Sequence, residues 1–385
     1  MAESVILDAV RTPIGRQNGA LREARPDVMY AHVINAMLER NNIDGSHIDD
    51  VITGCVTNMG EQGANIGRLG VMLSNLPVHV PAVTLNRMCG SSQQAIHFGA
   101  QAIAAGDADY VLAGGVESMT RVPMFSDIAG GFATLNPALA DKYELVHQGE
   151  SAERIAAKYG FSRRELDEWS YQSHVRAANA TKNELFVSQI AMLEGLDKSG
   201  NRISLKYDEG IRFEPDLDKM GKLPTVFRNE GTVTAANASQ ISDGAAIVLL
   251  GERERAIEDG FKPRAKFRAR VVAAGDPTLQ LWEVVPATHK ALRRAGLTIS
   301  DIDVVEINEA FASVVLAWLH EFKADPAKVN PNGGAIAHGH PLGATGAVLM
   351  TKLVNELERR NGQFGLQVMC IGHGQATATI IERIG

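Results

Sequence analysis

Two stretches in opposite halves of the chain repeat the same order of loops, strands and helices. This internal repeat limits the possible fold more than any single motif. Residues 43–52 run from a polar loop into an apolar strand, and residues 300–305 do the same in the second half. Each half then reaches a polar turn, at 86–92 and at 330–340, followed by an apolar helix and a further strand. We therefore predict a duplicated half-domain whose two sheets each place a turn at a shared central crevice, beyond the strand carboxyl ends.

The rest of the chain predicts an α/β fold, because strand-like runs rich in β-branched residues alternate with helical stretches. The 385 residues include 37 glycines and only 5% aromatics, which is typical of closely packed layers with many turns. We expect an N-terminal half at 1–120, completed by about 237–262, and a C-terminal half at 263–385. Residues 121–236 interrupt the repeat and are predicted to form an inserted loop or cap domain, which either covers a ligand or only packs on the surface.

Charge and cysteine content exclude several classes of function. The formal net charge of −7 leaves no basic stripe for nucleic acid. No basic segment followed by a long apolar stretch opens the chain, so neither a signal peptide nor a membrane span is expected. Cys55, Cys89 and Cys370 are an odd number without metal-ligand spacing, which predicts neither a disulfide framework nor a metal site. We expect a cytoplasmic protein in which at least one thiol takes part in chemistry.

Cys89 is the first candidate for chemistry. It follows an apolar strand and precedes the residues Gly90-Ser91-Ser92 that open a helix, so the helix dipole is expected to favour its thiolate. Backbone N–H groups at a helix start can also bind a developing oxyanion. A buried structural cysteine remains an equally good interpretation of this feature alone.

A cysteine nucleophile needs a base, and a glycine-rich loop offers two histidines. His340 is the better candidate because Pro341 follows it directly, whereas His338 has no comparable anchor. Cys370 ends an apolar strand at a second glycine turn, where a thiol can exchange a proton with a carbon acid. Asn308 stands at another strand end and either positions water or caps a helix. No histidine and no glycine-rich loop lies near Cys55 in the sequence, so we interpret it as a core residue.

Together these residues carry a family resemblance. The chain resembles the thiolases over nearly its whole length, and the motifs that match in family order are Asn86-Arg87-Met88-Cys89-Gly90-Ser91-Ser92, Asn308-Glu309-Ala310-Phe311, Gly333-Gly334-Ala335-Ile336-Ala337 with Gly339-His340-Pro341-Leu342-Gly343, and Cys370-Ile371-Gly372. The resemblance implies a five-layer α/β/α/β/α core made of two similar halves, together with an inserted loop domain.

The resemblance also implies residue roles. Cys89 would be the acylated nucleophile, His340 its base and Cys370 the acid and base at the substrate α-carbon. Asn308 would hold a water that helps His340 to stabilise the enolate oxygen, and the backbone N–H groups of Cys89 and Gly372 would form a second oxyanion hole. Coenzyme A would be a co-substrate contacted by Arg212, Ser239 and Phe311, with no tightly bound cofactor.

The implied reaction is transfer of an acyl group from a 3-ketoacyl-CoA to CoA with release of acetyl-CoA. Gln148, where short-chain biosynthetic thiolases typically carry methionine, favours a degradative enzyme over an acetyl-CoA acetyltransferase that forms acetoacetyl-CoA. A ketoacyl synthase-like enzyme and a non-catalytic CoA-binding scaffold are further alternatives. His338 and His373 depart from the family pattern, and we interpret both as tolerated substitutions away from the reacting atoms. The resemblance implies a homodimer or homotetramer.

Overall fold

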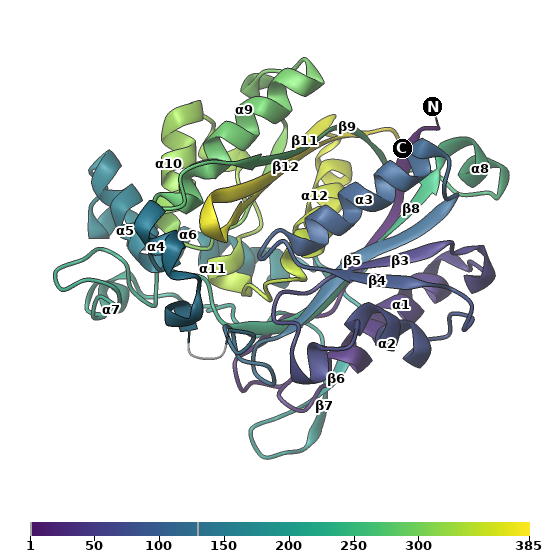
Figure 1. Cartoon of the computed structure of the whole chain (residues 1–385), viewed down its shortest axis with the longest axis horizontal. Coiled ribbons are helices and arrows are strands. Elements are labelled where there is room, and N and C mark those ends of the chain that lie inside the picture. Colours follow the sequence, from purple (N-terminus) through teal and green to yellow (C-terminus); the bar gives the residue numbers. More distant parts are fainter. Residues whose placement is uncertain (1, 129–130) are drawn as a thin grey trace.

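The computed structural model describes residues 2–128 and 131–385 (Figure 1). Its strands are β1 (Ser4–Arg11), β2 (Gly15–Arg16), β3 (Asp50–Gly54), β4 (Ala82–Leu85), β5 (Tyr110–Ser118), β6 (Leu193–Leu196), β7 (Arg202–Leu205), β8 (Ser242–Glu252), β9 (Ala265–Ala274), β10 (Val304–Ile307), β11 (Phe364–Ile371) and β12 (Gln375–Arg383). Its helices are α1 (Pro26–Asn41), α2 (Ile66–Leu73), α3 (Ser91–Ala105), α4 (Pro137–Lys142), α5 (Gln148–Tyr159), α6 (Arg163–Lys182), α7 (Leu217–Gly221), α8 (Arg253–Glu258), α9 (Val284–Ala295), α10 (Ala312–Phe322), α11 (Ala335–His338) and α12 (Thr345–Arg360).

The strand order confirms the duplication. In the first half, β3 pairs in parallel with β4 and β5, and β8 and then β1 continue the sheet in antiparallel fashion. In the second half, β10 pairs in parallel with β11, and β12 and β9 continue it in the same way. A single parallel bridge from Val305 to Val329 stands where β4 stands in the first half.

The two halves join edge to edge, which the sequence did not predict. Strand β1 pairs with β9 through Val5 and Ile6, so the strands of both halves form one continuous hydrogen-bonded sheet rather than two separate ones. Within the described residues this sheet has ten strands, and β6 and β7 form a separate hairpin.

The sheet curves around two helices that form the middle layer. Helix α3 packs on β3, β5 and β8, while α12 packs on β10 and β11 and also contacts α3 (Figure 1). Helices α1 and α2 cover the outer face of the first half, and α9 and α10 cover that of the second. The predicted five-layer α/β core is therefore confirmed.

The segment between β5 and β8 holds α4 to α7 and the β6–β7 hairpin. Helix α6 begins at a capping box in which Ser162 and Glu165 bond each other's backbone N–H groups. Helix α5 packs on α10, and α6 packs on α10 and α11, so these two helices lie against the second half. The β6–β7 hairpin instead packs on the first half, where Leu193 and Leu205 join its core. Among the described residues, no helix is long and apolar enough to cross a membrane.

Candidate active site

Four chain segments meet at the centre of the molecule, and three of them follow the carboxyl ends of parallel strands. Cys89 lies in the turn from β4 to α3, Asn308 follows β10, and Cys370 is near the end of β11. The loop between α11 and α12 supplies His340. All four side chains are buried, with at most 4% of their surface exposed. The structure thus brings together the side chains predicted from separate motifs.

The turn that carries Cys89 is tightly constrained. Met88 has a φ of 45°, a left-handed conformation that is uncommon for residues other than glycine. The Ser91 hydroxyl accepts a hydrogen bond from the Arg87 backbone N–H and donates one to the Met88 carbonyl. Gly90 must lack a side chain here, because a Cβ would lie 2.3 Å from a methyl group of Ile371. The position of the Cys89 sulfur is therefore fixed before any substrate binds.

The electrostatic prediction for Cys89 was wrong. Burial, together with the neighbouring Cys370 and Glu117, raises the pKa of the Cys89 thiol to about 12. The backbone N–H groups of Cys89 and Gly372 act in the opposite direction but do not outweigh burial. Helix α3 begins at Ser91, two residues after Cys89. The thiol is neutral at neutral pH, and forming the nucleophile requires a proton acceptor.

His340 is held in the form that can accept this proton. The Thr345 hydroxyl donates its hydrogen to the Pro341 carbonyl at 2.9 Å, so it accepts from His340 Nδ1, which lies 2.6 Å away. The proton of the neutral ring therefore sits on Nδ1, and Nε2 keeps its lone pair. Burial lowers the pKa of His340 to about 4, so the ring is neutral at neutral pH.

Asn308 connects the imidazole to the second thiol. Its side-chain Nδ2 lies 3.4 Å from His340 Nε2 and 3.6 Å from Cys370 Sγ. Among the described residues, its buried Oδ1 has no hydrogen-bond partner. Burial raises the pKa of Cys370 to about 11, and the contact with Asn308 opposes this rise. Two neutral thiols and one neutral imidazole thus share a buried site, which suits proton transfer between carbon and sulfur.

Replacing Thr345 with valine tests its effect on His340. Valine has nearly the same shape but leaves Nδ1–H without an acceptor, so either ring tautomer becomes accessible. We expect kcat to fall about tenfold or more, because losing a buried partner costs about 1–3 kcal/mol. Steady-state thiolysis of acetoacetyl-CoA measures the effect. Thr345→Ser retains the hydroxyl and should restore most of the rate, whereas equal rates in both variants would contradict this role.

Sequence reasoning missed Glu117, a buried carboxylate that holds two of the site loops together. It accepts hydrogen bonds from the backbone N–H groups of Val56, Thr57 and Gly343 at 2.8–3.1 Å and from the Gln62 amide at 2.7 Å. Burial raises its pKa. The available signal was an acid within the otherwise apolar strand β5.

Cys55 and His338 lie outside the group of reacting side chains. Cys55 is fully buried among core residues of the first half, as predicted. His338 is anchored after all, because Nδ1 lies 2.7 Å from Asp208, which pairs with the buried Arg11. Its Nε2 lies 2.9 Å from the Asn332 carbonyl. The ring fixes the loop that carries His340 and takes no place beside the thiols.

Two of the residues expected to contact CoA, Ser239 and Phe311, lie on adjoining segments. Ser239 donates its backbone N–H to the Ala310 carbonyl, and the neighbouring Ala238 bridges to Phe311. Phe311 also packs edge-on against Phe227. Arg212 is exposed, and its backbone N–H donates to His174. Ser239 and Phe311 therefore lie close to Asn308, whereas Arg212 belongs to a separate loop between β7 and α7.

A cavity of about 110 Å³ opens at Cys89. It is lined by Val56, Thr57, Asn86, Met88, Cys89, Met124, Phe125, Asp127, Ile128, Leu135, Gln148, Leu342 and His373. His373 therefore borders the reaction site, contrary to our interpretation from sequence. Gln148 borders it as well, and its amide nitrogen would lie 2.9 Å from a Cβ at Gly372.

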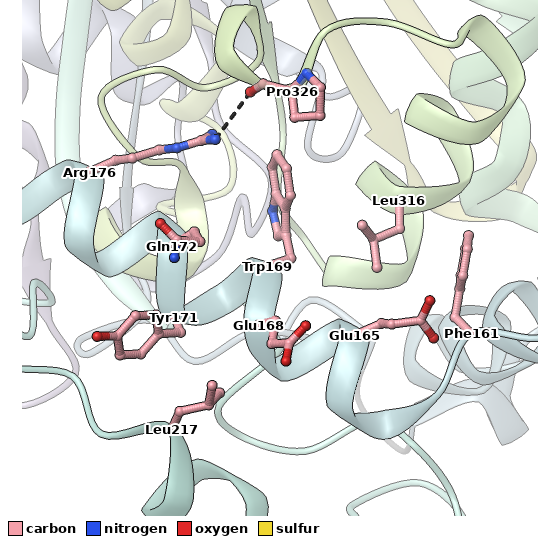
Figure 2. A pocket seen from close by; sticks show the side chains of 10 residues that line it. All are labelled: Phe161, Glu165, Glu168, Trp169, Tyr171, Gln172, Arg176, Leu217, Leu316 and Pro326. Carbon is pink, nitrogen blue, oxygen red and sulfur yellow. Dashed lines mark hydrogen bonds between the residues drawn. The ribbon is translucent and has the colours of Figure 1, made fainter.

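A larger groove of about 520 Å³ lies elsewhere, over α6 and α10 (Figure 2). Figure 2 shows Trp169 between Leu316 and Arg176, with Glu165 and Glu168 along the same helix. Its lining contains no cysteine or histidine. Trp169 donates its indole N–H to Glu309, the neighbour of Asn308, so this groove touches the site only indirectly. Among the described residues, no cluster of side chains is suited to hold a metal ion.

Comparison with known proteins identifies the family of this chain. The family description "Thiolase, N-terminal domain" matches residues 4–254, and "Thiolase, C-terminal domain" matches residues 261–383. A steroid 3-ketoacyl-CoA thiolase of Mycobacterium tuberculosis is 48% identical over 100% of this chain and 95% of its own. Over the full length of both chains, a 3-ketoacyl-CoA thiolase of Klebsiella pneumoniae is 43% identical and a β-ketoadipyl-CoA thiolase of Acinetobacter baylyi is 41% identical. The chain belongs to the thiolase family of acyltransferases.

Proposed function

We propose that this thiolase cleaves a 3-ketoacyl-CoA with CoA, releases acetyl-CoA, and carries the shortened acyl group as a thioester on Cys89. The observation that carries the proposal is the arrangement of two buried thiols around one neutral imidazole. Asn308 Nδ2 lies 3.4 Å from His340 Nε2 and 3.6 Å from Cys370 Sγ. A single nucleophile and base would suffice for simple acyl transfer, whereas cleavage of a carbon–carbon bond also needs an acid at the leaving carbon.

In the first half-reaction, the Cys89 thiol gives its proton to His340 Nε2, and the thiolate attacks the 3-keto carbon. The bond between C2 and C3 then breaks, and its electron pair forms the enolate of acetyl-CoA. Cys370 donates its proton to C2, so acetyl-CoA leaves and Cys370 becomes a thiolate. A water held by Asn308, together with protonated His340, stabilises the enolate oxygen.

In the second half-reaction, the Cys370 thiolate takes the proton of the incoming CoA thiol. The CoA sulfur attacks the thioester carbon, and the bond from that carbon to Cys89 sulfur breaks. Cys89 recovers its proton from His340, which restores all three groups. The backbone N–H groups of Cys89 and Gly372, which already point at the Cys89 sulfur, form the second oxyanion hole.

We place the pantetheine arm of CoA along Ser239 and Phe311, beside the strand end that carries Asn308. Arg212 is an exposed cation suited to the nucleotide phosphates. Residues 121–236 then act as a loop domain that covers the ligand, between an N-terminal half at 1–120 with 237–262 and a C-terminal half at 263–385. Catalysis through two reduced thiols favours a cytoplasmic location.

We further propose a homo-oligomer that forms on the first half. Strand β4 lies at the edge of the sheet, and Val83 on it is 45% exposed. Met72, Leu73 and Phe98 on the neighbouring helices α2 and α3 are also exposed. An unpaired edge with apolar neighbours favours strand pairing with a second copy. Light scattering after size-exclusion chromatography measures the mass, and Val83→Lys should shift it toward the monomer.

A thiolysis panel tests the proposed reaction. We expect specificity constants for straight-chain 3-ketoacyl-CoA substrates of four to twelve carbons to rise beyond acetoacetyl-CoA. Each buried methylene contributes up to about 0.8 kcal/mol until the cavity ends. Relatives named 3-ketoacyl-CoA thiolase and β-ketoadipyl-CoA thiolase support thiolysis as the reaction. A sharp maximum at four carbons would instead favour an acetyl-CoA acetyltransferase, and the absence of thiolysis would contradict the proposal.

A further inference from the structure

His338 is the last residue of α11, and only Gly339 separates it from the proposed base His340. Its side chain is buried. Both ring nitrogens have a partner within hydrogen-bond distance. Nδ1 lies 2.7 Å from a carboxyl oxygen of Asp208, and Nε2 lies 2.9 Å from the backbone carbonyl oxygen of Asn332. These two partners decide which ring nitrogens carry a proton.

Neither partner can donate a hydrogen. A backbone carbonyl oxygen only accepts. Burial alone would raise the pKa of Asp208, but Arg11 and His338 outweigh it and hold that pKa well below its ordinary value, so the group is a carboxylate. Two N–H groups of Arg11 donate to its two oxygens at 2.7 and 3.1 Å, and the Ile14 backbone N–H donates to one of them at 2.9 Å. Both nitrogens of the imidazole therefore face acceptors.

A neutral imidazole cannot make both contacts, because it carries only one N–H. With the proton on Nδ1, the lone pair of Nε2 would face the Asn332 oxygen at 2.9 Å. With the proton on Nε2, the lone pair of Nδ1 would face the Asp208 carboxylate at 2.7 Å. Either tautomer loses one buried hydrogen bond and leaves two acceptors in contact. An imidazolium instead donates to both partners.

The charged groups around the ring act in opposite directions. Burial, the charge of Lys352 and the guanidinium beside Asp208 lower the pKa of His338, whereas the hydrogen bond to Asp208 and its charge raise this pKa. Lys352 has a carboxyl partner of its own, because its Nζ lies 2.8 Å from Glu306. His174 is a further titratable neighbour, and burial lowers its pKa to about 4, so it is neutral at neutral pH. The two hydrogen bonds favour the charged ring.

The ring joins three separate parts of the chain. Asp208 belongs to the loop between β7 and α7, and Asn332 lies just before α11. Arg11, which pairs with the same carboxylate, ends β1. The position of the His340 backbone therefore depends on an anchor that exists in full only while both ring nitrogens are protonated.

We propose that His338 is a positioning residue that works as a buried imidazolium, which donates to Asp208 and Asn332 at once and so holds the loop that carries His340. Loss of one proton leaves one of the two acceptors without a donor and loosens this loop. The acid form makes both bonds, so the positioning effect is present at low pH and is lost as pH rises through the pKa of the ring. The effect on catalysis rests on the proposed thiolysis reaction, whereas the charge of the ring does not.

The charge is tested by NMR of protein labelled with ¹⁵N in its histidine rings. Signals that are missing from His338→Phe identify the ring of His338. We expect two protonated ring nitrogens for His338 at neutral pH, and the loss of one of these protons at alkaline pH. The ring of His340, which is neutral at neutral pH, provides the comparison within the same protein. One protonated and one bare nitrogen in His338 at neutral pH would overturn the inference.

The positioning role is tested by the ratio of kcat for the wild type to kcat for His338→Phe, which keeps a planar ring but makes neither hydrogen bond. Steady-state thiolysis of acetoacetyl-CoA is followed from about pH 6 to about pH 10, on both sides of the ordinary pKa of histidine. Titration of CoA and of the other site groups is common to both proteins and cancels in the ratio. We expect a ratio of about tenfold at the acid end, with similar KM, that falls toward one at the alkaline end.

Two further variants complete the test. His79→Ala removes an exposed imidazole elsewhere and should keep the wild-type kcat at every pH. His338→Gln, which keeps an uncharged donor, takes the place of His338→Phe in both experiments if that variant does not fold. A kcat ratio that is independent of pH, or that rises with pH, would overturn the positioning role. If the wild type does not cleave acetoacetyl-CoA, the proposed reaction fails, and the NMR result still decides the charge of the ring.

Discussion

Cys89→Ser is expected to lower thiolysis by about 10⁴-fold or more while the protein stays folded. A serine hydroxyl is far harder to ionise than a thiol, and His340, whose pKa is about 4, is a weak base for it. Loss of the nucleophile removes both half-reactions at once, so the defect should appear in kcat rather than in KM. Steady-state kinetics with acetoacetyl-CoA and CoA measure it.

Two controls make this result specific. Circular dichroism and thermal unfolding should show that Cys89→Ser has the secondary structure of the wild type. Cys55→Ser, at a buried cysteine in the core of the first half, should lose stability rather than catalytic power per folded molecule. Folded Cys89→Ser protein with more than about 1% of the wild-type rate would exclude Cys89 as the nucleophile.

Cys370→Ala is expected to separate the two half-reactions. The variant keeps Cys89, His340 and Thr345. Transfer of an acetyl group from acetyl-CoA to Cys89 should therefore continue at a reduced rate, because the CoA sulfur can leave as a thiolate without the proton that Cys370 otherwise supplies. Exchange of the α-protons of acetyl-CoA with deuterium in the solvent should fall by about 10²- to 10⁴-fold, the usual contribution of a positioned acid or base. Mass spectrometry of the acetyl-enzyme and of recovered acetyl-CoA measures the two rates separately.

His340→Ala is the comparison for Cys370→Ala. It removes the acceptor of the Cys89 proton, so acylation itself should slow. If folded Cys370→Ala lost acylation and α-proton exchange equally, the division of roles between the thiols would be wrong.

The sequence was informative where a residue type and its glycine-rich surroundings occur together. Cys89 and His340 each lie in a loop that contains glycine, and Cys370 lies near the end of β11, just before Gly372. The structure buries all three side chains. The repeat predicted two similar halves for a related reason, because hydrophobic runs return at matching points in both. The predicted α/β core, family and thiolase activity are confirmed by the fold and the comparisons. The catalytic and CoA-binding roles remain predictions.

The sequence failed where the partner of a residue lies far along the chain. Glu117 bonds Gly343, 226 residues away, and Gln280 joins the turn after β11 to the inserted segment. No local sequence pattern predicts such long-range contacts. No sequence motif identified Thr345 as part of the site, although its hydroxyl sets the tautomer of His340.

The electrostatic state of Cys89 was also beyond sequence reasoning. Proximity to a helix start suggested a stabilised thiolate. However, the free energy of ionising the Cys89 thiol also depends on how completely the fold buries it. Burial raises the pKa of Cys89 to about 12 and lowers that of His340 to about 4, so the neutral pair is the resting state. His373 was misjudged for a related reason, because the cavity it borders is assembled from segments on both sides of α4.

The most direct test of the account is to identify the cysteine that carries the acyl group. The protein is mixed with acetyl-CoA, quenched in acid within the first turnover, digested and mapped by mass spectrometry. We expect one acetyl group, on the peptide that contains Cys89, and none on the peptides that contain Cys55 or Cys370. An acetyl group on Cys370 in place of Cys89, or turnover without any acylated cysteine, would contradict the central claim.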